Sequence, residues 1–263
     1  MSDKPQAPST SIGLPQGCLP LLLALQFLTR IPMPDIGILN NAQVGRSLLW
    51  YPVVGGFIGC LLWLLQLLLQ LLLPDLWAVQ AGLLLLVWCL VTGGLHLDGL
   101  ADSADAWAGG LGDRERTLAL MQDPTCGPAA VMVLVLLLLV KFSALTTLIA
   151  NAPSSLLLAP LVARAMLLLL FLTTDYVRSG GIGALLAQYF PRQLALYQLL
   201  LLALLLVLIG GVMGLLILLC SLLLFCGLRW LMCRRLGGTT GDTAGAVVEL
   251  SEAMVLLALL VGG

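Results

Sequence analysis

The feature that most constrains the fold of this 263-residue chain is a series of uninterrupted apolar runs. Several of them exceed the roughly 18 residues that a helix needs to cross a bilayer. Apolar residues make up 60% of the chain and charged residues 10%. Only helices or closed barrels satisfy their backbone polar groups in lipid. We therefore predict an all-α, polytopic transmembrane helical bundle formed by one integral membrane domain, residues 18–263.

We expect about seven spans, separated by short connections. They are predicted at residues 47–73, 76–97, 128–150, 154–174, 194–209, 212–232 and 244–261. The run at 18–28 is too short to span and is followed by prolines at 32 and 34, which indicates a short interfacial or re-entrant helix. Residues 1–17 are polar and proline-rich and are expected to form a disordered tail. Gly210-Gly211 is either a turn between two spans or a kink in one long helix.

Basic residues are distributed asymmetrically in this seven-span arrangement. Ten of the twelve lie on one side, and the positive-inside rule places that side in the cytoplasm. These ten are Lys4, Arg30, Arg46, Arg114, Arg116, Arg178, Arg192, Arg229, Arg234 and Arg235. The seven cysteines form no CxxC pair, so neither a zinc site nor a disulfide framework is expected.

A cluster of acidic residues follows the second predicted span. Asp98, Asp102 and Asp105 fall at i, i+4 and i+7 and would share one face of a helix. Three like charges so close repel one another unless a cation lies among them, and carboxylate oxygens suit Mg²⁺ or Mn²⁺. The alternative is a solvated helix end. His96, the only histidine, is a candidate general base, metal ligand or orienter of Asp98.

Two further segments contain candidate ligands. Asp123 precedes Pro124 and either forms a turn or supplies a further metal or substrate ligand. The second segment is a glycine-rich loop that leads into a helix, where free backbone N–H groups attract phosphate oxygens. Its candidate residues are Gly238, Thr240, Gly241 and Asp242, and Asp242 either caps the helix or holds a metal.

Four charged residues lie well inside predicted spans, where a lone charge is costly. Lys141 and Arg164 either neutralise Glu249 and Glu252 or bind phosphate. Glu249 lies seven residues after Asp242 and shares its helix face, so it could extend the acidic cluster into the bilayer.

Taken together, these motifs resemble the adenosylcobinamide-GDP ribazoletransferases, or cobalamin-5′-phosphate synthases. The resemblance covers nearly the whole chain. It rests on Gly93-Gly94-Leu95-His96-Leu97-Asp98-Gly99-Leu100-Ala101-Asp102 and Gly237-Gly238-Thr239-Thr240-Gly241-Asp242, with further matches at 27–34, 51–55, 121–124, 141–142 and 164.

The resemblance implies an Mg²⁺-dependent phosphotransferase in the last assembly step of vitamin B12 (cobalamin) biosynthesis. Its donor would be adenosylcobinamide-GDP, its acceptor α-ribazole or the 5′-phosphate of α-ribazole, and its product GMP besides the cobalamin. Catalytic roles fall to His96, Asp98 and Asp102, with metal ligands at Asp98, Asp102, Asp105, Asp123 and Asp242. Phosphate contacts fall to Arg30, Arg46, Lys141, Arg164, Gly238, Thr240 and Gly241, with Glu249 and Glu252 as further candidates.

The acidic cluster, the loop after it and the loop at 237–242 lie on the side that the basic residues assign to the cytoplasm, so we expect an active site that faces the cytoplasm. With the resemblance, this indicates a multi-pass protein of the bacterial inner membrane. The lipid bilayer is an expected partner and nucleic acid is not, whereas a homo-oligomer is compatible with the sequence without being specified by it. Two alternatives belong to other classes. A CDP-alcohol type phosphotransferase also holds Mg²⁺ on membrane helices, but its longer spacing pattern is missing here. A cation transporter would place carboxylates near the bilayer midplane.

Overall fold

A computed structural model describes residues 17–37 and 39–262, so the predicted disordered tail lies outside the described residues except for Gly17. All named elements in this part of the chain are helices, which confirms the predicted all-α fold. The α-helices are α1 (Leu19–Leu28), α2 (Asn41–Ser47), α3 (Tyr51–Leu72), α4 (Trp77–Thr92), α5 (Leu95–Gly109), α6 (Arg114–Leu120), α7 (Pro128–Asn151), α8 (Leu158–Thr173), α9 (Gly181–Tyr189), α10 (Arg192–Leu236) and α11 (Gly241–Gly262). Two short 3₁₀ helices, η1 (Leu48–Trp50) and η2 (Pro153–Leu157), precede α3 and α8.

Five helical segments are long and apolar enough to cross a membrane, and a sixth arises if the bent pair α4–α5 counts as one span. The five are Asn41–Leu72, Pro128–Asn151, Pro153–Thr173, Arg192–Leu236 and Gly241–Val261. This is one or two fewer than the predicted seven. The largest difference lies in α10, which covers two predicted spans as one element.

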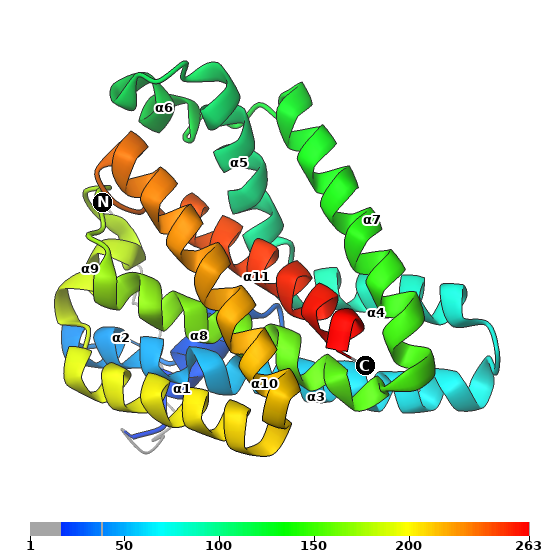
Figure 1. Ribbon diagram of the computed structural model, residues 1–263. Helices are drawn as coiled ribbons and strands as arrows, with labels where there is room; N and C mark the ends of the chain where they lie inside the picture. The colour runs from blue at the N-terminus through cyan, green and yellow to red at the C-terminus, as the bar shows by residue number, and fades with distance from the viewer. Residues whose placement is uncertain (1–16, 38, 263) are drawn as a thin grey trace, which may run out of the picture.

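The α10 helix is nevertheless broken where the sequence predicted a hinge. Gly211 has φ 56° and ψ −132°, which is not helical, and the two arms of α10 run in different directions (Figure 1). Gly214 on the second arm lies so close to the first that a Cβ atom there would sit 3.3 Å from Val207 Cα. The kinked-helix alternative is therefore the better description, with a sharp bend that glycine permits.

A second sharp bend replaces the predicted continuous span 76–97. Helix α4 ends at Thr92 and α5 begins at Leu95, and their axes meet at 88°. Gly93 and Gly94 both adopt left-handed φ values, 62° and 68°, which a residue with a side chain rarely adopts. The glycine pair thus directs the acidic helix α5 away from α4.

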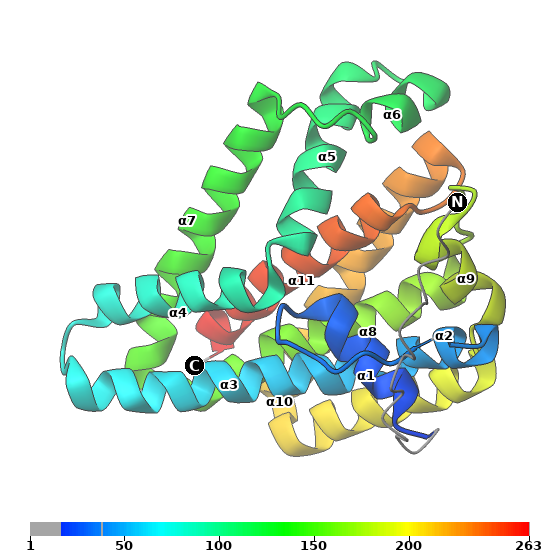
Figure 2. The ribbon, with the colours of Figure 1, turned by 180° about the vertical axis from the view of Figure 1, so that it is seen from behind.

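Helix α11 runs through the middle of the molecule and packs against α5, α7, α8 and α10 (Figures 1 and 2). Helices α3 and α4 form an antiparallel hairpin joined by a buried hydrogen bond of 2.6 Å from Gln66 to Gln80. Gly55 and Gly59 let α3 approach α8 and η2, because Cβ atoms there would lie 2.9 Å from Leu161 Cα and 2.8 Å from Leu157 Cα. These two glycines therefore allow α3 to pack closely against its neighbours.

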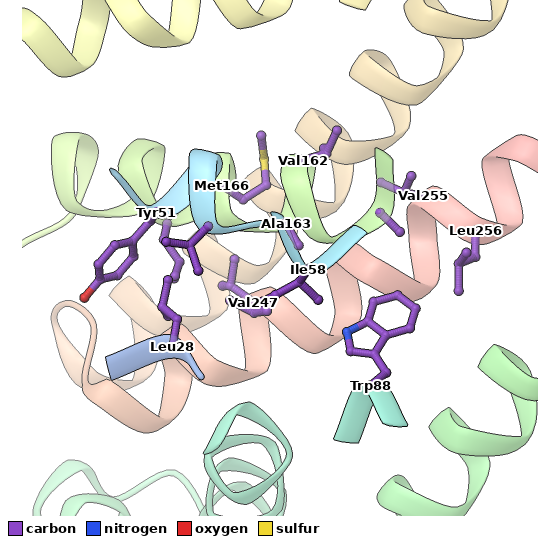
Figure 3. Close-up of a cluster of buried hydrophobic side chains, with 14 of the residues drawn as sticks. Leu28, Tyr51, Ile58, Trp88, Val162, Ala163, Met166, Val247, Val255 and Leu256 are labelled. Atoms are coloured by element: carbon purple, nitrogen blue, oxygen red, sulfur yellow. The ribbon is translucent and has the colours of Figure 1, made fainter. Parts of the chain in front are cut away.

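The main hydrophobic core lies between α1, α3, α8 and α11. Figure 3 shows part of this cluster, including Leu28, Ile58 and Val247, which are fully buried. Large apolar side chains also point outward from α3, α7 and α10, as at Leu71 and Leu223, which are both 78% exposed. Such outward apolar surfaces match a lipid environment.

Candidate active site

Two cavities share Asp98, in the first turn of α5, as a lining residue. Cavity 1 has a volume of about 340 Å³ and is mainly apolar, with His96, Asp98 and Asp242 among its lining residues. Cavity 2 has a volume of about 520 Å³ and is lined by Asp98, Asp102 and Asp105 together with Arg30. The predicted sharing of one helix face by the three aspartates is therefore confirmed, because all three line the same cavity.

The three aspartates differ in what their carboxylates contact. Asp105 accepts hydrogen bonds from the backbone N–H groups of Gly127 at 2.6 Å and Ala130 at 2.9 Å, so it caps the start of α7. Asp98 is exposed and Asp102 half-buried, and within residues 17–37 and 39–262 neither carboxylate makes a hydrogen bond or ion pair with the protein. These two remain available to a ligand.

Arg30 is the basic residue that faces this acidic cluster. Its backbone N–H donates to Val91 O at 2.7 Å, which fixes the segment after α1 against the end of α4. Its side chain lies over Gly93, where a Cβ atom would sit 2.7 Å from Arg30 Cδ. A guanidinium in a carboxylate-lined cavity can bind the phosphate of a ligand. Arg46, predicted for the same role, is exposed on α2 and lines neither cavity.

Helix α11 approaches α5 at Gly99 of the acidic motif. A Cβ atom on Gly99 would lie 3.0 Å from Asp242 Cα, and one on Gly245 would lie 3.3 Å from Gly99 Cα. This close approach brings Asp242 into the wall of cavity 1 beside Asp98. Asp242 also forms an ion pair of 2.7 Å with Arg178, so its carboxylate is already engaged.

The end of the glycine-rich loop lines cavity 1, whereas its start packs against the neighbouring backbone. Gly241 lines cavity 1, whereas Gly238 packs on the backbone of Asp175. Thr240 is fully buried, and its hydroxyl accepts from the backbone N–H of Thr243 at 3.2 Å. Thr240 is thus a helix cap, and of the three predicted phosphate ligands in this loop only Gly241 faces a cavity.

Asp123 forms a turn, which is the first of the two roles that the sequence allowed for it. Its carboxylate accepts from the backbone N–H of Thr125 at 2.9 Å and from the Thr125 hydroxyl at 2.6 Å. These hydrogen bonds hold the pKa of the Asp123 carboxyl below its usual value. Asp123 lines a third cavity, of about 480 Å³, and not the one that contains Asp98 and Asp102.

His96 is buried, lines cavity 1 and lies two residues before Asp98 on α5. Its Nδ1 atom has no hydrogen-bond partner in the described residues. A buried polar atom without a partner is costly and is common where a ligand or water binds. This position fits the predicted role of His96 as a proton acceptor more closely than a role as orienter of Asp98.

Lys141, Arg164, Glu249 and Glu252 form a buried ion-pair network between α7, α8 and α11. Lys141 Nζ lies 2.5 Å from both Glu249 Oε2 and Glu252 Oε2, and Arg164 pairs with Glu252 Oε1. None of the four lines cavity 1 or cavity 2. The structure therefore supports the pairing alternative, and not the phosphate contacts of Lys141 and Arg164 or the extension of the acidic cluster to Glu249.

Sequence reasoning missed two residues at the site, a partner of Asp242 and a residue of the wall of cavity 1. Arg178 was counted only as a basic residue near a membrane boundary, although it pairs with Asp242. Tyr176 lines cavity 1 and is held by a backbone bridge to Thr239, more than sixty residues along the chain, so no local pattern indicates it. Burial raises the pKa of the Tyr176 hydroxyl, which keeps this side chain neutral.

A metal ion could be held here only with help from a ligand. Within residues 17–37 and 39–262, no three His, Cys, Asp or Glu side chains lie close enough together to form a metal site. Mg²⁺, however, is often bound by one or two carboxylates together with substrate phosphates and water. Asp98 and Asp102 fit this mode because they are one helical turn apart in the same cavity and lack protein partners there.

The fold and these cavities define a polytopic helical membrane protein with an acidic, arginine-containing site at the bend between two helices. A model of the family described as cobalamin-5-phosphate synthase matches residues 20–260. The chain belongs to this family, which confirms the resemblance seen in its motifs, and it is therefore a transferase.

Similar proteins from several bacteria are named adenosylcobinamide-GDP ribazoletransferase. The chain is 56% identical over 242 residues to one from Pseudomonas entomophila, covering 92% of this chain and 98% of that protein. It is 54% identical over 245 residues to one from Pseudomonas putida, covering 93% and 99%. It is 56% identical over 247 residues to one from Stutzerimonas stutzeri, covering 93% and 99%. No solved structure matches the chain significantly.

Proposed function

We propose that this protein transfers the adenosylcobinamide-phosphate group of adenosylcobinamide-GDP to α-ribazole, or to its 5′-phosphate, and releases GMP. The observation that carries the proposal is the pair of available carboxylates, Asp98 and Asp102, next to Arg30 in one cavity. A diphosphate donor needs its charge neutralised, and an arginine and a carboxylate-held cation both do this. The names of the similar proteins supply the donor and the acceptor.

The transfer step proposed here is a direct in-line displacement. A ribose hydroxyl oxygen of the acceptor forms a bond to the phosphorus that carries the cobinamide. The bond from that phosphorus to the bridging oxygen breaks, and GMP leaves with that oxygen. The hydroxyl proton passes to His96 or to an aspartate of the site. A phosphorylated enzyme, trapped with labelled donor in the absence of acceptor, would refute direct displacement.

We further propose that Mg²⁺, or Mn²⁺ in its place, is the cofactor. When bound at Asp98 and Asp102 it would neutralise the diphosphate and stabilise the leaving GMP. The remaining steps depend on the chain itself: Arg30 binds phosphate, Asp102 and Asp98 fix the position of the reacting group, and the apolar wall of cavity 1 excludes water.

The proposed location is the bacterial inner membrane, with the site open to the cytoplasm. Basic side chains support this orientation because they gather around the C-terminal end of α5, the end toward which the acidic helix runs from the site. Arg114 donates to Leu236 O at 2.7 Å, and Arg235 donates to Trp107 O at 3.0 Å. A cluster of arginines at one membrane boundary is typical of the cytoplasmic side.

The test is release of GMP, coupled to formation of cobalamin, by the purified protein in detergent. We expect turnover with Mg²⁺, loss of turnover with EDTA, and recovery when Mg²⁺ is added back. Asp102→Ala, compared with wild type at equal helix content by circular dichroism, should be inactive. A folded wild-type protein without turnover would overturn the proposal, and cation flux into vesicles or transfer from CDP-alcohols would then identify one of the two alternatives.

A further inference from the structure

Cavity 1 is an aromatic pocket built from four separate parts of the chain. Phe27 on α1 stacks with Tyr51 on α3, with ring centroids 6.3 Å apart and planes at 21°. Phe171 on α8 stacks with Tyr176, with centroids 6.1 Å apart and planes at 13°. All four side chains line the cavity, and the rest of its wall is mainly aliphatic. Such a wall binds a planar, uncharged aromatic group.

Polar side chains form only a small part of the wall of cavity 1. Besides the two tyrosines, the ionisable residues of the lining are His96, Asp98 and Asp242. Helix α11 begins beside them at Gly241. Asp98 is also part of the wall of cavity 2. A ligand in cavity 1 would therefore have an apolar aromatic body, with a polar part that reaches the carboxylates at the junction of the two cavities.

The two cavities differ in size and in polarity, as the two substrates do. The donor carries a diphosphate and a large corrin, and a volume of about 340 Å³ lies near the lower limit of roughly 300–1,000 Å³ for small-molecule sites. Cavity 1 is thus too small for the donor. Cavity 2 is larger and holds Arg30 beside three carboxylates, which suits a diphosphate and a divalent cation.

We propose that cavity 1 binds the benzimidazole base of the acceptor ribazole between these aromatic side chains, while cavity 2 takes the diphosphate of the donor. This assignment rests on the proposed function. It places the acceptor ribose at the junction, near His96 and Asp98, where its hydroxyl can reach the phosphorus bound in cavity 2. Asp98 then contacts both substrates, and cavity 1 determines specificity for the base.

Ile182 offers a test that leaves the catalytic residues in place. It lies on the short helix α9, lines cavity 1 and is 45% exposed, so a larger side chain can be accommodated without disturbing the core. We expect Ile182→Trp to occlude the pocket and to raise KM for α-ribazole by about tenfold or more, within the roughly 10–200-fold range of hydrophobic pocket contacts. KM for adenosylcobinamide-GDP, and kcat at saturating acceptor, should stay near their wild-type values.

Tyr189→Trp is the matched control, because Tyr189 lies on the same helix, is 39% exposed and lines neither cavity. It should leave both KM values unchanged. Should Ile182→Trp fail to fold, Ile182→Ser removes apolar wall from the same position and should also raise only KM for α-ribazole. Binding of free benzimidazole to the protein without donor, followed by calorimetry, should weaken in parallel.

The outcomes separate this assignment from the proposed function. An active wild type whose KM for α-ribazole is unaffected by both Ile182 variants would overturn the assignment alone. A rise in KM for the donor would also overturn it. So would a loss of benzimidazole binding in Tyr189→Trp as large as the loss in Ile182→Trp. Binding of a lipid alkyl chain in cavity 1, with no binding of benzimidazole, would assign cavity 1 to lipid instead. An inactive wild type would remove the proposed function and this assignment together.

Discussion

Removing one charge from the buried ion-pair network should destabilise the protein far more than removing a balanced pair. Lys141, Arg164, Glu249 and Glu252 are at most 4% exposed, and the two positive and two negative charges balance. Glu252 is the central member because it pairs with both Lys141 and Arg164. Glu252→Gln keeps the shape of the side chain and leaves one uncompensated positive charge among helices α7, α8 and α11.

Breaking a buried ion pair by removing one partner typically costs about 3–5 kcal/mol. We expect Glu252→Gln to fall in that range, and Arg164→Met likewise, because it leaves an uncompensated negative charge. The double variant Arg164→Met/Glu252→Gln keeps the Lys141–Glu249 pair of 2.5 Å and restores neutrality. It should therefore cost less than either single change, with a coupling energy of several kcal/mol by the double-mutant cycle.

The assay is reversible unfolding of the purified protein in mixed micelles with increasing denaturing detergent, followed by circular dichroism. The three variants are compared with wild type under identical conditions. Exposed Arg46→Met is the control for loss of an arginine outside the network, and it should change the free energy of unfolding by less than about 0.5 kcal/mol. Additive costs in the double variant would refute the argument, because they would show that the four charges do not act as one unit.

Three more predictions concern the acidic site. Asp102→Asn should lower kcat by roughly a hundredfold or more without loss of helix content, since it removes a charged ligand of the proposed Mg²⁺; activity close to wild type would exclude Asp102 from the site. Gly93→Ala should destabilise the protein by about 1–3 kcal/mol in the same unfolding assay, because φ is 62° there and the added Cβ meets Arg30, and an unchanged stability would show that the bend tolerates a side chain. Asp123→Ala should keep kcat and Mg²⁺ dependence near wild type, since its carboxylate is engaged by Thr125 outside cavity 2, whereas a large loss of Mg²⁺ affinity would return Asp123 to the metal site.

Local sequence patterns were sufficient to predict the class of fold and the acidic residues at the centre of the candidate site. Long apolar runs require helices in lipid, whatever the rest of the chain does. The i, i+4, i+7 spacing of Asp98, Asp102 and Asp105 puts three carboxylates on one face of any helix, and the structure places all three in one cavity. A glycine pair likewise marked the sharp bend at 210–211, whereas the bend at 93–94 was missed because residues 76–97 were predicted to form one span.

Tertiary structure decided which polar side chains have protein partners and which remain available to a ligand. Asp105 and Asp98 are equivalent in the sequence pattern, yet only the approach of α7 gives Asp105 the N–H groups of Gly127 and Ala130 as partners. The choice of pairing for Arg164 depends on how α8 and α11 pack, since a buried charge takes whichever opposite charge the packing brings near it.

The aromatic wall of cavity 1 was also beyond sequence reasoning. Phe27, Tyr51, Phe171 and Tyr176 come from four separate segments, and no local pattern links them to one another. The sequence by itself determined a helical membrane protein with an acidic helix, because those properties depend on neighbours along one helix. Only the folded chain determined the two cavities and their meeting at Asp98, because long-range packing of α1, α3, α8 and α11 sets which side chains face one another.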